Sequence, residues 1–151
     1  MVLCLLQRVS NASVSVDGET IATIDAGLLV LVGVERGDAK AQAARMAERL
    51  LAYRVFEDAQ GKMNRSLAQI DGGLLLVPQF TLPANTSKGN RPSFGRAAPP
   101  QVGKELFDEL VQQARALHKS VAIGRFGANM QVALVNDGPV TFMLQVTPTA
   151  E

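Results

Sequence analysis

Two short segments of the chain place polar groups at the ends of apolar runs. Gln79-Phe80-Thr81 follows one such run, and Gly138-Pro139 directly precedes a second run of β-favoured residues. Backbone N–H groups at the end of a strand can orient an ester and stabilise the oxyanion that develops when it is cleaved. We therefore take Gln79, Phe80 and Thr81 as candidate catalytic residues. By itself, Gly138-Pro139 indicates only a turn.

Residues that usually act as a base or hold a metal are scarce. The only histidine, His118, falls at the expected end of a helix, where a positive side chain is stabilised electrostatically. The only cysteine, Cys4, excludes an internal disulfide and a cysteine zinc site, and we expect it to be buried in the first strand. The sequence holds no Gly-x-Ser-x-Gly elbow, no phosphate-binding glycine loop and no cluster of metal ligands. If the chain is an enzyme, we expect it to use neither metal nor cofactor, and its reaction has to be intrinsically easy.

Three interpretations of Thr81 stay open at this level. Its hydroxyl can hold a water molecule beside backbone amides, it can attack a substrate directly, or it can be a β-favoured residue without a role. Direct attack is the weaker chemical interpretation because no base is in sight to activate the hydroxyl. The chemistry would then fall mainly to the backbone and to the substrate itself.

Length and composition indicate a single domain spanning residues 1–151. Apolar residues make up 47% of the chain, and the longest apolar runs are far shorter than the roughly 20 residues that span a bilayer. The N-terminal segment lacks the basic start of a signal peptide. Together with the single cysteine, this favours a cytoplasmic protein without a membrane partner.

Charge is nearly balanced overall but unevenly distributed. A net charge of +1 argues against a general nucleic-acid binder, yet residues 83–104 hold four basic residues and no acidic one. Residues 110–136 hold three basic residues and again no acidic one. Such a local basic surface can meet a phosphate backbone even on a near-neutral protein. The alternative is an ordinary solvated loop and helix face.

Hydrophobic periodicity predicts an α+β domain in which two main helices pack against a curved, mostly antiparallel, barrel-like sheet. We expect a hairpin turn at Asp17-Gly18 and a helix cap at Asp38. Further along, the pattern is typical of a turn or short hairpin at residues 56–64 and of a long loop at residues 83–100. The helices are expected at residues 39–53 and 101–118. The strands are expected at residues 2–9, 12–16, 20–24, 27–34, 74–82, around 121, 130–135 and 140–146.

A set of short strings resembles the D-aminoacyl-tRNA deacylase family over essentially the whole chain. Because the strings occur in the family's order, they are far more specific together than any one of them. They include Leu6-Gln7-Arg8-Val9, Gly61-Lys62-Met63-Asn64, Gln79-Phe80-Thr81-Leu82, Arg91-Pro92-Ser93-Phe94, Gly124-Arg125-Phe126-Gly127-Ala128 and Asn136-Asp137-Gly138-Pro139-Val140-Thr141.

The resemblance implies a homodimer in which Gly138-Pro139 is a cis pair that projects into the active site of the partner subunit. Its backbone carbonyl groups would grip the α-amino group of the bound amino acid. A D side chain would then point into open space, whereas an L side chain would collide. Arg8 would support the Gly138-Pro139 loop; without the resemblance it is an ordinary charge at the end of a strand.

The resemblance also implies a substrate and a mechanism. The enzyme would hydrolyse the ester at the 3′ end of a D-aminoacyl-tRNA, and also glycyl-tRNA(Ala), because glycine has no side chain to reject. The backbone of Gln79, Phe80 and Thr81 would line the ester, and the terminal 2′-OH of the tRNA would assist its hydrolysis. An activated ester of this kind fits a chain without a side-chain base.

Pro78 is a departure from the family, which usually has serine immediately before Gln-Phe-Thr-Leu. As a candidate substrate-binding residue, it lacks the hydroxyl and backbone donor of that serine. In a related animal deacylase with relaxed chirality, the corresponding segment resembles Pro-Gln-Ala-Thr-Leu. Phe80 and Gly138-Pro139 nevertheless group this chain with the D-specific enzymes. Two other functions stay open: a relaxed deacylase that also accepts small L-amino acids, and a non-catalytic tRNA-binding barrel.

Overall fold

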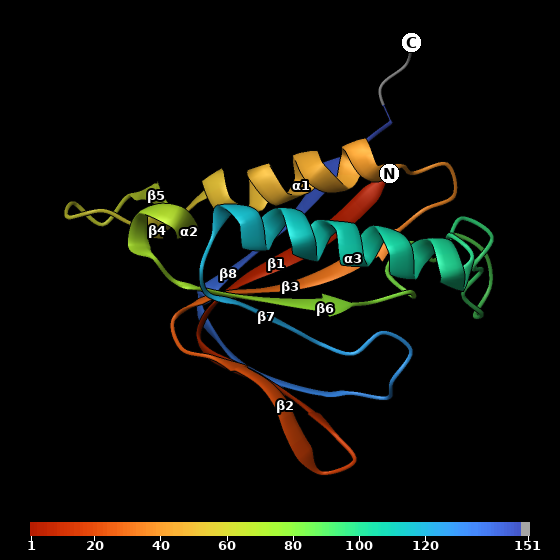
Figure 1. Cartoon of the computed structure of the whole chain (residues 1–151), viewed down its shortest axis with the longest axis horizontal. Helices are drawn as coiled ribbons and strands as arrows, with labels where there is room; N and C mark the ends of the chain where they lie inside the picture. The colour runs from red at the N-terminus through yellow and green to blue at the C-terminus, as the bar shows by residue number, and fades with distance from the viewer. Residues whose placement is uncertain (149–151) are drawn as a thin grey trace.

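The computed structural model describes residues 1–148 and arranges them as one curved sheet with helices on one face. α1 and α3 lie side by side across this face, and the β1–β2 hairpin extends away from them (Figure 1). The small β4–β5 sheet and the short α2 lie at one end of the helical layer. The helices are α1 (Lys40–Ala52), α2 (Leu67–Ile70) and α3 (Pro100–Leu117). The strands are β1 (Val2–Val16), β2 (Glu19–Ile24), β3 (Gly27–Val34), β4 (Arg54–Glu57), β5 (Met63–Ser66), β6 (Gly73–Pro78), β7 (Val121–Ile123) and β8 (Gln131–Val146).

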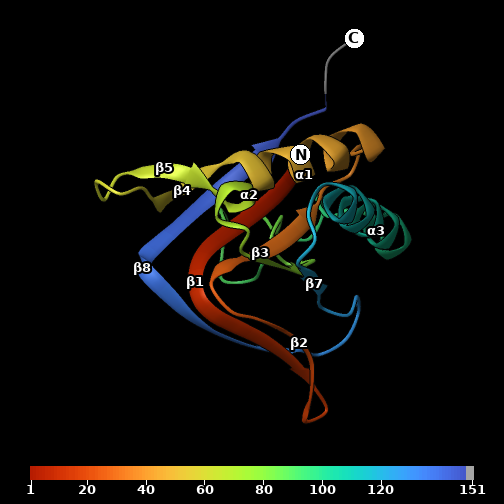
Figure 2. The ribbon, with the colours of Figure 1, turned by 60° about the vertical axis from the view of Figure 1, so that its left-hand side comes forward.

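β1 organises the sheet because it is long enough to pair with two successive strands along one edge and with β8 along the other. One edge pairs with β3 over residues 2–9 and with β2 over residues 12–16, while the other edge pairs with β8. The register with β8 shifts between Gln7 and Asn11, near the point where β3 gives way to β2, and such irregularities bend a strand. β1 and β8 curve together around the molecule (Figure 2). The predicted α+β class with a barrel-like curved sheet is confirmed.

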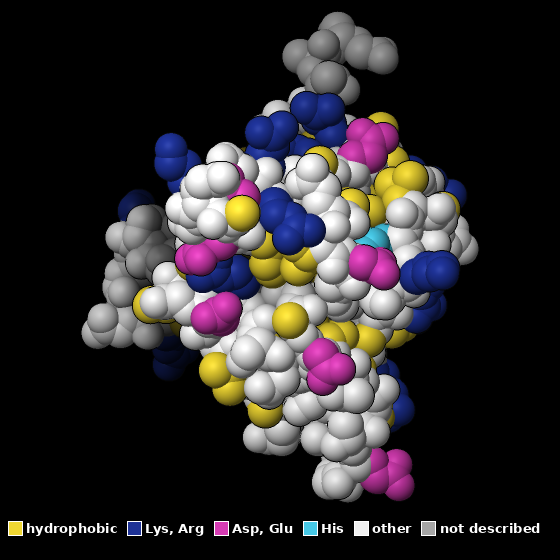
Figure 3. Space-filling model, turned by 90° about the vertical axis from the view of Figure 1, so that its left-hand side faces the viewer, with side chains coloured by type: hydrophobic (Ala, Val, Ile, Leu, Met, Phe, Trp, Pro, Cys, Tyr) yellow, Lys and Arg dark blue, Asp and Glu magenta, His cyan; other side chains and the backbone are white. Residues whose placement is uncertain are grey.

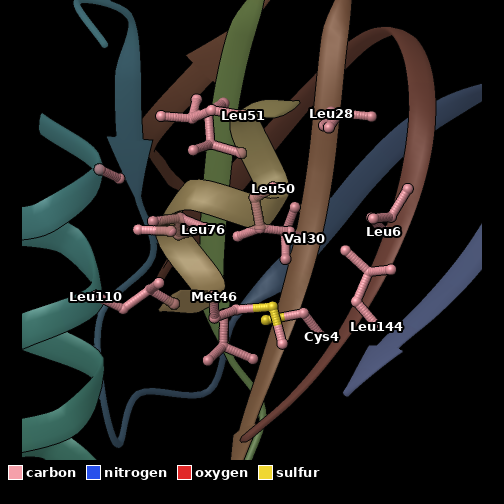
Figure 4. Packing of buried hydrophobic residues seen from close by; sticks show 14 of the residues in the cluster. Cys4, Leu6, Leu28, Val30, Met46, Leu50, Leu51, Leu76, Leu110 and Leu144 are labelled. Carbon is pink, nitrogen blue, oxygen red and sulfur yellow. The ribbon is translucent and has the colours of Figure 1, made fainter. Parts of the chain in front are cut away.

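Two hydrophobic clusters follow from this curvature. The larger one lies between the sheet and the long helices, where Val30 and Leu76 of the strands meet Met46, Leu50 and Leu110 of α1 and α3 (Figure 4). Each fully buried leucine of this kind contributes about 2 kcal/mol. The smaller cluster fills the inside of the curl with residues of β1, β2, β3 and β6: Val9, Ala12, Val14, Ala22, Ile24, Leu29, Leu75 and Val77.

Several predicted boundaries are wrong, although the elements themselves are present. Residues 2–16 form one strand rather than two, and so do residues 131–146, because β1 and β8 pair with each other along both lengths. The strand expected at residues 74–82 ends at Pro78. The structure also adds α2, which is too short to leave a periodic signal. Not all neighbours are antiparallel, since β6 pairs in parallel with both β3 and β7.

Asp38 does not cap α1. Ala39 occupies the N-cap position, and its N–H donates to Oε1 of Gln42 at 2.7 Å. The Asp38 carboxylate instead accepts from the N–H of Glu35 at 2.8 Å, so it closes the turn between β3 and α1. In the part of the chain that the structure describes, no helix is both long and apolar enough to cross a membrane.

Candidate active site

A cavity of about 510 Å³ opens where β6 ends, and a volume in this range suits a small-molecule site. One wall consists of Pro78, Gln79 and Phe80. The other walls come from the end of β3, from the loop before α3, from the first two turns of α3, and from the segment between β7 and β8. The cavity therefore collects elements that follow the ends of three neighbouring strands, β3, β6 and β7.

The predicted catalytic segment forms a turn beyond the end of β6. The N–H of Gln79 still continues the sheet and donates to the carbonyl oxygen of Val32 at 2.8 Å. The carbonyl oxygen of Gln79 then accepts from the N–H of Leu82 at 3.2 Å. Within residues 1–148, the N–H groups of Phe80 and Thr81 donate to no backbone or side-chain acceptor. The N–H of Phe80, which lines the cavity, and the N–H of Thr81, which follows it, are therefore left available as donors.

The side chains of this segment have separate surroundings. Phe80 is 67% exposed and pairs with Phe94, with the ring centroids 5.7 Å apart. An aromatic pair thus borders the cavity. Thr81 is not part of the cavity lining, and its Oγ1 accepts a hydrogen bond from Nε2 of Gln79. The structure therefore brings Pro78, Gln79 and Phe80 to one wall and leaves the Thr81 side chain outside it.

The only histidine and the only cysteine of the chain, His118 and Cys4, do not line this cavity. His118 is buried, and its Nε2 lies 2.6 Å from the carbonyl oxygen of Gly72, so it ties the end of α3 to the start of β6. Gly72 and Gln79 flank the six residues of β6, which places them about 20 Å apart. Cys4 is fully buried in β1, as predicted, and this burial raises the pKa of its thiol far above the ordinary value. Among residues 1–148, no group of three or more His, Cys, Asp or Glu side chains is arranged to hold a metal ion.

Pro78 stands where a missing backbone donor has little consequence. The carbonyl of Leu76 faces β7 and accepts from the N–H of Gly124 at 2.8 Å, whereas Gln79 faces β3. By the alternation of a strand, position 78 faces the β7 side, and β7 has already ended at Ile123. Proline is tolerated at such a position because no ladder hydrogen bond is lost.

We expect Pro78→Ser to leave the D-specific deacylation that the sequence resemblance implies within about tenfold of the unchanged protein, equivalent to about 1.4 kcal/mol. The new N–H and hydroxyl would lie at the cavity wall, but the turn of residues 79–82 is held by contacts that proline does not make. Comparing kcat/KM of the two proteins on D- and L-tyrosyl-tRNA measures the effect. A larger change, or new activity on the L substrate, would show that this position controls rate or chirality.

Gly138 and Pro139 line a different cavity, of about 520 Å³, together with Arg8 and the tip of the β4–β5 hairpin. They lie within a bulge of β8. Gln7 of β1 pairs with Thr141 and Val9 pairs with Asn136, so residues 137–140 face only Arg8 on the neighbouring strand. The peptide bond between Gly138 and Pro139 is cis.

Arg8 lies in the middle of β1 and is 8% exposed, so it is not a charge at a strand end. Its Nε donates to the carbonyl oxygen of Asp137 at 3.0 Å, and its Nη1 donates to that of Val55 at 2.9 Å. A guanidinium can be buried here because its donors are directed at two fixed acceptors. Asn136 closes the bulge from the other side, since its Oδ1 accepts from the N–H of Val140 at 3.0 Å. Arg8 thereby joins the Gly138-Pro139 bulge to β4.

The two halves of the predicted site do not meet within one chain. Arg8 pairs with Leu28 of β3, and Pro78 pairs with Val32 of the same strand. Leu28 and Val32 lie four positions apart on β3, which corresponds to about 13 Å along the strand. The two cavities share no lining residue. On the face with the β4–β5 hairpin, cationic, anionic and hydrophobic side chains are interspersed (Figure 3).

The sequence missed the far wall of the larger cavity. Phe94, Phe126 and Met130 line it, although none of them was assigned to the site. Two of these residues lie within the family-like strings at residues 91–94 and 124–128, which was the available signal. Nothing in their spacing shows that the loop before α3 and the segment after β7 face the end of β6.

The curved α+β domain presents free backbone donors at the end of β6, next to a cavity of about 510 Å³, and this arrangement suits an enzyme that orients a reactive substrate. Comparison with known proteins identifies which one. The family model described as D-Tyr-tRNA(Tyr) deacylase matches residues 5–145. This chain belongs to that family, a family of hydrolases, so the predicted resemblance and the predicted enzyme class are confirmed.

Individual relatives agree with this assignment. A D-aminoacyl-tRNA deacylase of Nitrosococcus oceani is 59% identical over 99% of this chain and 96% of its own length. One of Pseudomonas putida is 64% identical over 94% of this chain and 98% of its own length. A solved structure named c-Myc DNA Unwinding Element Binding Protein has a TM-score of 0.92 at 37% identity, over 97% of this chain and 99% of that one. A probable eukaryotic D-amino acid tRNA deacylase shares the fold, with a TM-score of 0.82 at 19% identity over 96% and 99% of the two chains.

Proposed function

We propose that this protein hydrolyses the ester of D-aminoacyl-tRNA in the cytoplasm and releases the free D-amino acid and the tRNA. Membership of the family supports the substrate class. The observation that carries the proposal is the pair of free N–H groups on Phe80, which lines the cavity, and on Thr81, which follows it. Among the described residues that line this cavity there is no Asp, Glu or His. An ester that needs only orientation and oxyanion stabilisation suits this arrangement.

In the proposed reaction, water adds to the carbonyl carbon of the ester, and negative charge develops on the carbonyl oxygen. The N–H groups of Phe80 and Thr81 donate to this oxygen, and donors of this kind typically contribute about a hundredfold to a thousandfold in rate. The bond to the ribose 3′ oxygen then breaks, and this oxygen takes up a proton. The neighbouring 2′-OH of the tRNA mediates the proton transfer that a side-chain base would otherwise perform. The scheme requires neither a metal nor a cofactor.

We further propose that the working unit is a homodimer in which Gly138-Pro139 of one subunit enters the cavity of the other. This arrangement is supported by the separation of the two halves in a single chain, about 13 Å along β3. Gly138-Pro139 would hold the α-amino group through backbone carbonyl groups and leave no room for an L side chain. Glycine presents no side chain, so glycyl-tRNA(Ala) would also be hydrolysed.

Replacing Arg8 by lysine is expected to lower kcat/KM for D-tyrosyl-tRNA by about tenfold or more. A lysine ammonium is a single donor centre on a flexible chain and does not reproduce the rigid fork by which Nε and Nη1 of Arg8 reach two carbonyl groups, so the tie between the Gly138-Pro139 bulge and β4 is weakened. The matched control is Arg65→Lys, because Arg65 also donates to a backbone carbonyl but is exposed on β5. Equal losses of kcat/KM in both variants would show that Arg8 has no specific role in the site.

The decisive experiment is to incubate the purified protein with D-tyrosyl-tRNA, L-tyrosyl-tRNA and glycyl-tRNA(Ala) in the presence of EDTA and to follow amino acid release. We expect D-tyrosine and glycine to be released while L-tyrosine stays bound to its tRNA. Loss of activity in EDTA would contradict the metal-free scheme.

Two alternative functions give different results in the same assay. A non-catalytic tRNA-binding barrel would bind all the charged tRNAs and release no amino acid. A deacylase with relaxed chirality, which Pro78 suggests, would also hydrolyse L-alanyl-tRNA, so this substrate belongs in the assay.

A further inference from the structure

A second cavity, of about 370 Å³, adjoins the larger one. It lies between α3 and the end of β7, and Phe107 and Phe126 line both cavities. The two spaces therefore share an aromatic wall. The two cavities differ in their charged residues: Lys104, Asp108 and Arg125 line the smaller one, and Arg36 lines the larger one.

Arg125 is the residue of this cavity best suited to an anion. Its backbone is held in place because its N–H donates to Sδ of Met130 at 3.3 Å, and the preceding Gly124 donates to Leu76 of β6 at 2.8 Å. Within residues 1–148, no carboxylate forms an ion pair with its guanidinium. A guanidinium offers several donors in a planar fork that matches two oxygen atoms of a phosphate.

Lys104 adds a second cation on the α3 side. Its Nζ lies 2.7 Å from Oδ2 of Asp108, one turn along the helix, and both side chains are more than half exposed. An exposed ion pair of this type is weak and is readily exchanged for another anion. The cavity thus holds one unpaired and one exchangeable cation beside an aromatic wall.

We propose that Lys104 and Arg125 form a phosphate subsite for the phosphodiester that precedes the terminal nucleoside of the bound tRNA. The inference rests on the proposed function, in which the larger cavity receives the esterified end of the RNA. A chain that ends in this cavity carries its nearest phosphate at the 5′ side of the terminal ribose. The adjoining cavity with its two cations is the surface that matches that charge. Arg36, the charged residue that lines the larger cavity, is already engaged there, because its Nε donates to the carbonyl oxygen of Gly95 at 2.9 Å.

The test compares two substrates that differ in this phosphate. D-tyrosyl-adenosine, esterified on its ribose, has no phosphodiester, whereas D-tyrosyl-CpCpA has one directly before the terminal adenosine. We expect Arg125→Gln and Lys104→Gln each to lower kcat/KM on D-tyrosyl-CpCpA about tenfold, mainly through KM, and to leave D-tyrosyl-adenosine within about twofold. The dependence of log(kcat/KM) on log salt concentration should also become shallower, by about 0.7 for each cation removed.

Two further variants separate the subsite from general damage. Arg115→Gln removes an arginine that lies eleven residues after Lys104 on α3 and lines neither cavity. It should leave kcat/KM for both substrates unchanged. Asp108→Asn removes the anion that competes for Lys104 and should lower KM for D-tyrosyl-CpCpA about twofold to threefold. Structural damage would not produce such a gain.

Equal losses on both substrates, or no loss on D-tyrosyl-CpCpA, would overturn the subsite. Failure of the proposed function has a different signature, because the wild type would then hydrolyse neither substrate. In that case binding of uncharged CpCpA and of adenosine by the same proteins decides the question. The subsite predicts about tenfold weaker binding of CpCpA to Arg125→Gln and unchanged binding of adenosine, and any other pattern contradicts it.

Discussion

Gly138→Ala is expected to lower kcat/KM for D-tyrosyl-tRNA by at least about a hundredfold, or about 2.7 kcal/mol of transition-state stabilisation. Gly138 has a φ of +139°, which L side chains rarely adopt. A Cβ at this position would lie 2.6 Å from Cγ2 of Val140, 2.8 Å from the backbone nitrogen of Val140 and 3.3 Å from Nη2 of Arg8. The bulge that presents Gly138-Pro139 would therefore have to move, and the proposed contact with the α-amino group would be lost.

Gly18→Ala is the matched control for this prediction. Gly18 also has a positive φ, of +81°, but a Cβ there would meet no atom within 4 Å. It lies in the β1–β2 turn, away from both cavities that hold predicted site residues. We expect a loss of about 1 kcal/mol in stability and unchanged kcat/KM. If Gly138→Ala folds and keeps its activity and chirality, the proposed role of the bulge is wrong.

A D-tyrosyl-tRNA whose terminal ribose lacks the 2′-OH is expected to lose most of its deacylation, by about a hundredfold or more. The reason is that none of the described residues that line the larger cavity is an aspartate, glutamate, histidine or lysine, so proton transfer depends on the substrate. The Thr81 side chain lies outside the cavity and bonds to Gln79. Single-turnover rates on the normal and the 2′-deoxy substrates measure this dependence directly.

Thr81→Ala provides the complementary measurement and should keep activity within about tenfold, because the backbone N–H remains. If Thr81→Ala instead loses its activity while the unchanged protein hydrolyses the 2′-deoxy substrate normally, Thr81 is the nucleophile. Thr81→Ser then checks the assignment, since serine restores the hydroxyl without the methyl group. Recovery in this variant would support nucleophilic attack.

The secondary structure could be predicted in outline because it depends on local pattern. β3 is a continuous apolar run in the sequence, and its consecutive residues Leu28 and Leu29 lie on opposite faces of the sheet and enter different clusters. The predicted strand boundaries were wrong where pairing between distant strands keeps locally polar residues in the sheet. The polar segments between the strands expected at residues 2–9 and 12–16, and at 130–135 and 140–146, are held in strands only because β1 and β8 pair with each other.

The candidate site was predictable in its parts and not in its assembly. Gln79-Phe80-Thr81 and Gly138-Pro139 were found from motif strings and strand ends. The strand end itself was misplaced, since residues 79–82 form a turn whose amides are free only because β6 stops at Pro78. That Arg8 faces the bulge of β8 follows from a register shift between strands more than a hundred residues apart, which no local pattern encodes.

The sequence alone determined the family, the α+β class, the absence of an internal disulfide and the segments that we propose for the active site. These follow from residue type, order and short-range periodicity. Only the tertiary structure decided that Phe94 and Phe126 face the end of β6, that Arg8 is buried against Asp137, and that the two halves of the site lie apart within one chain. The physical reason is that sheet register and side-chain packing join residues distant in sequence, and these contacts are set by the whole fold.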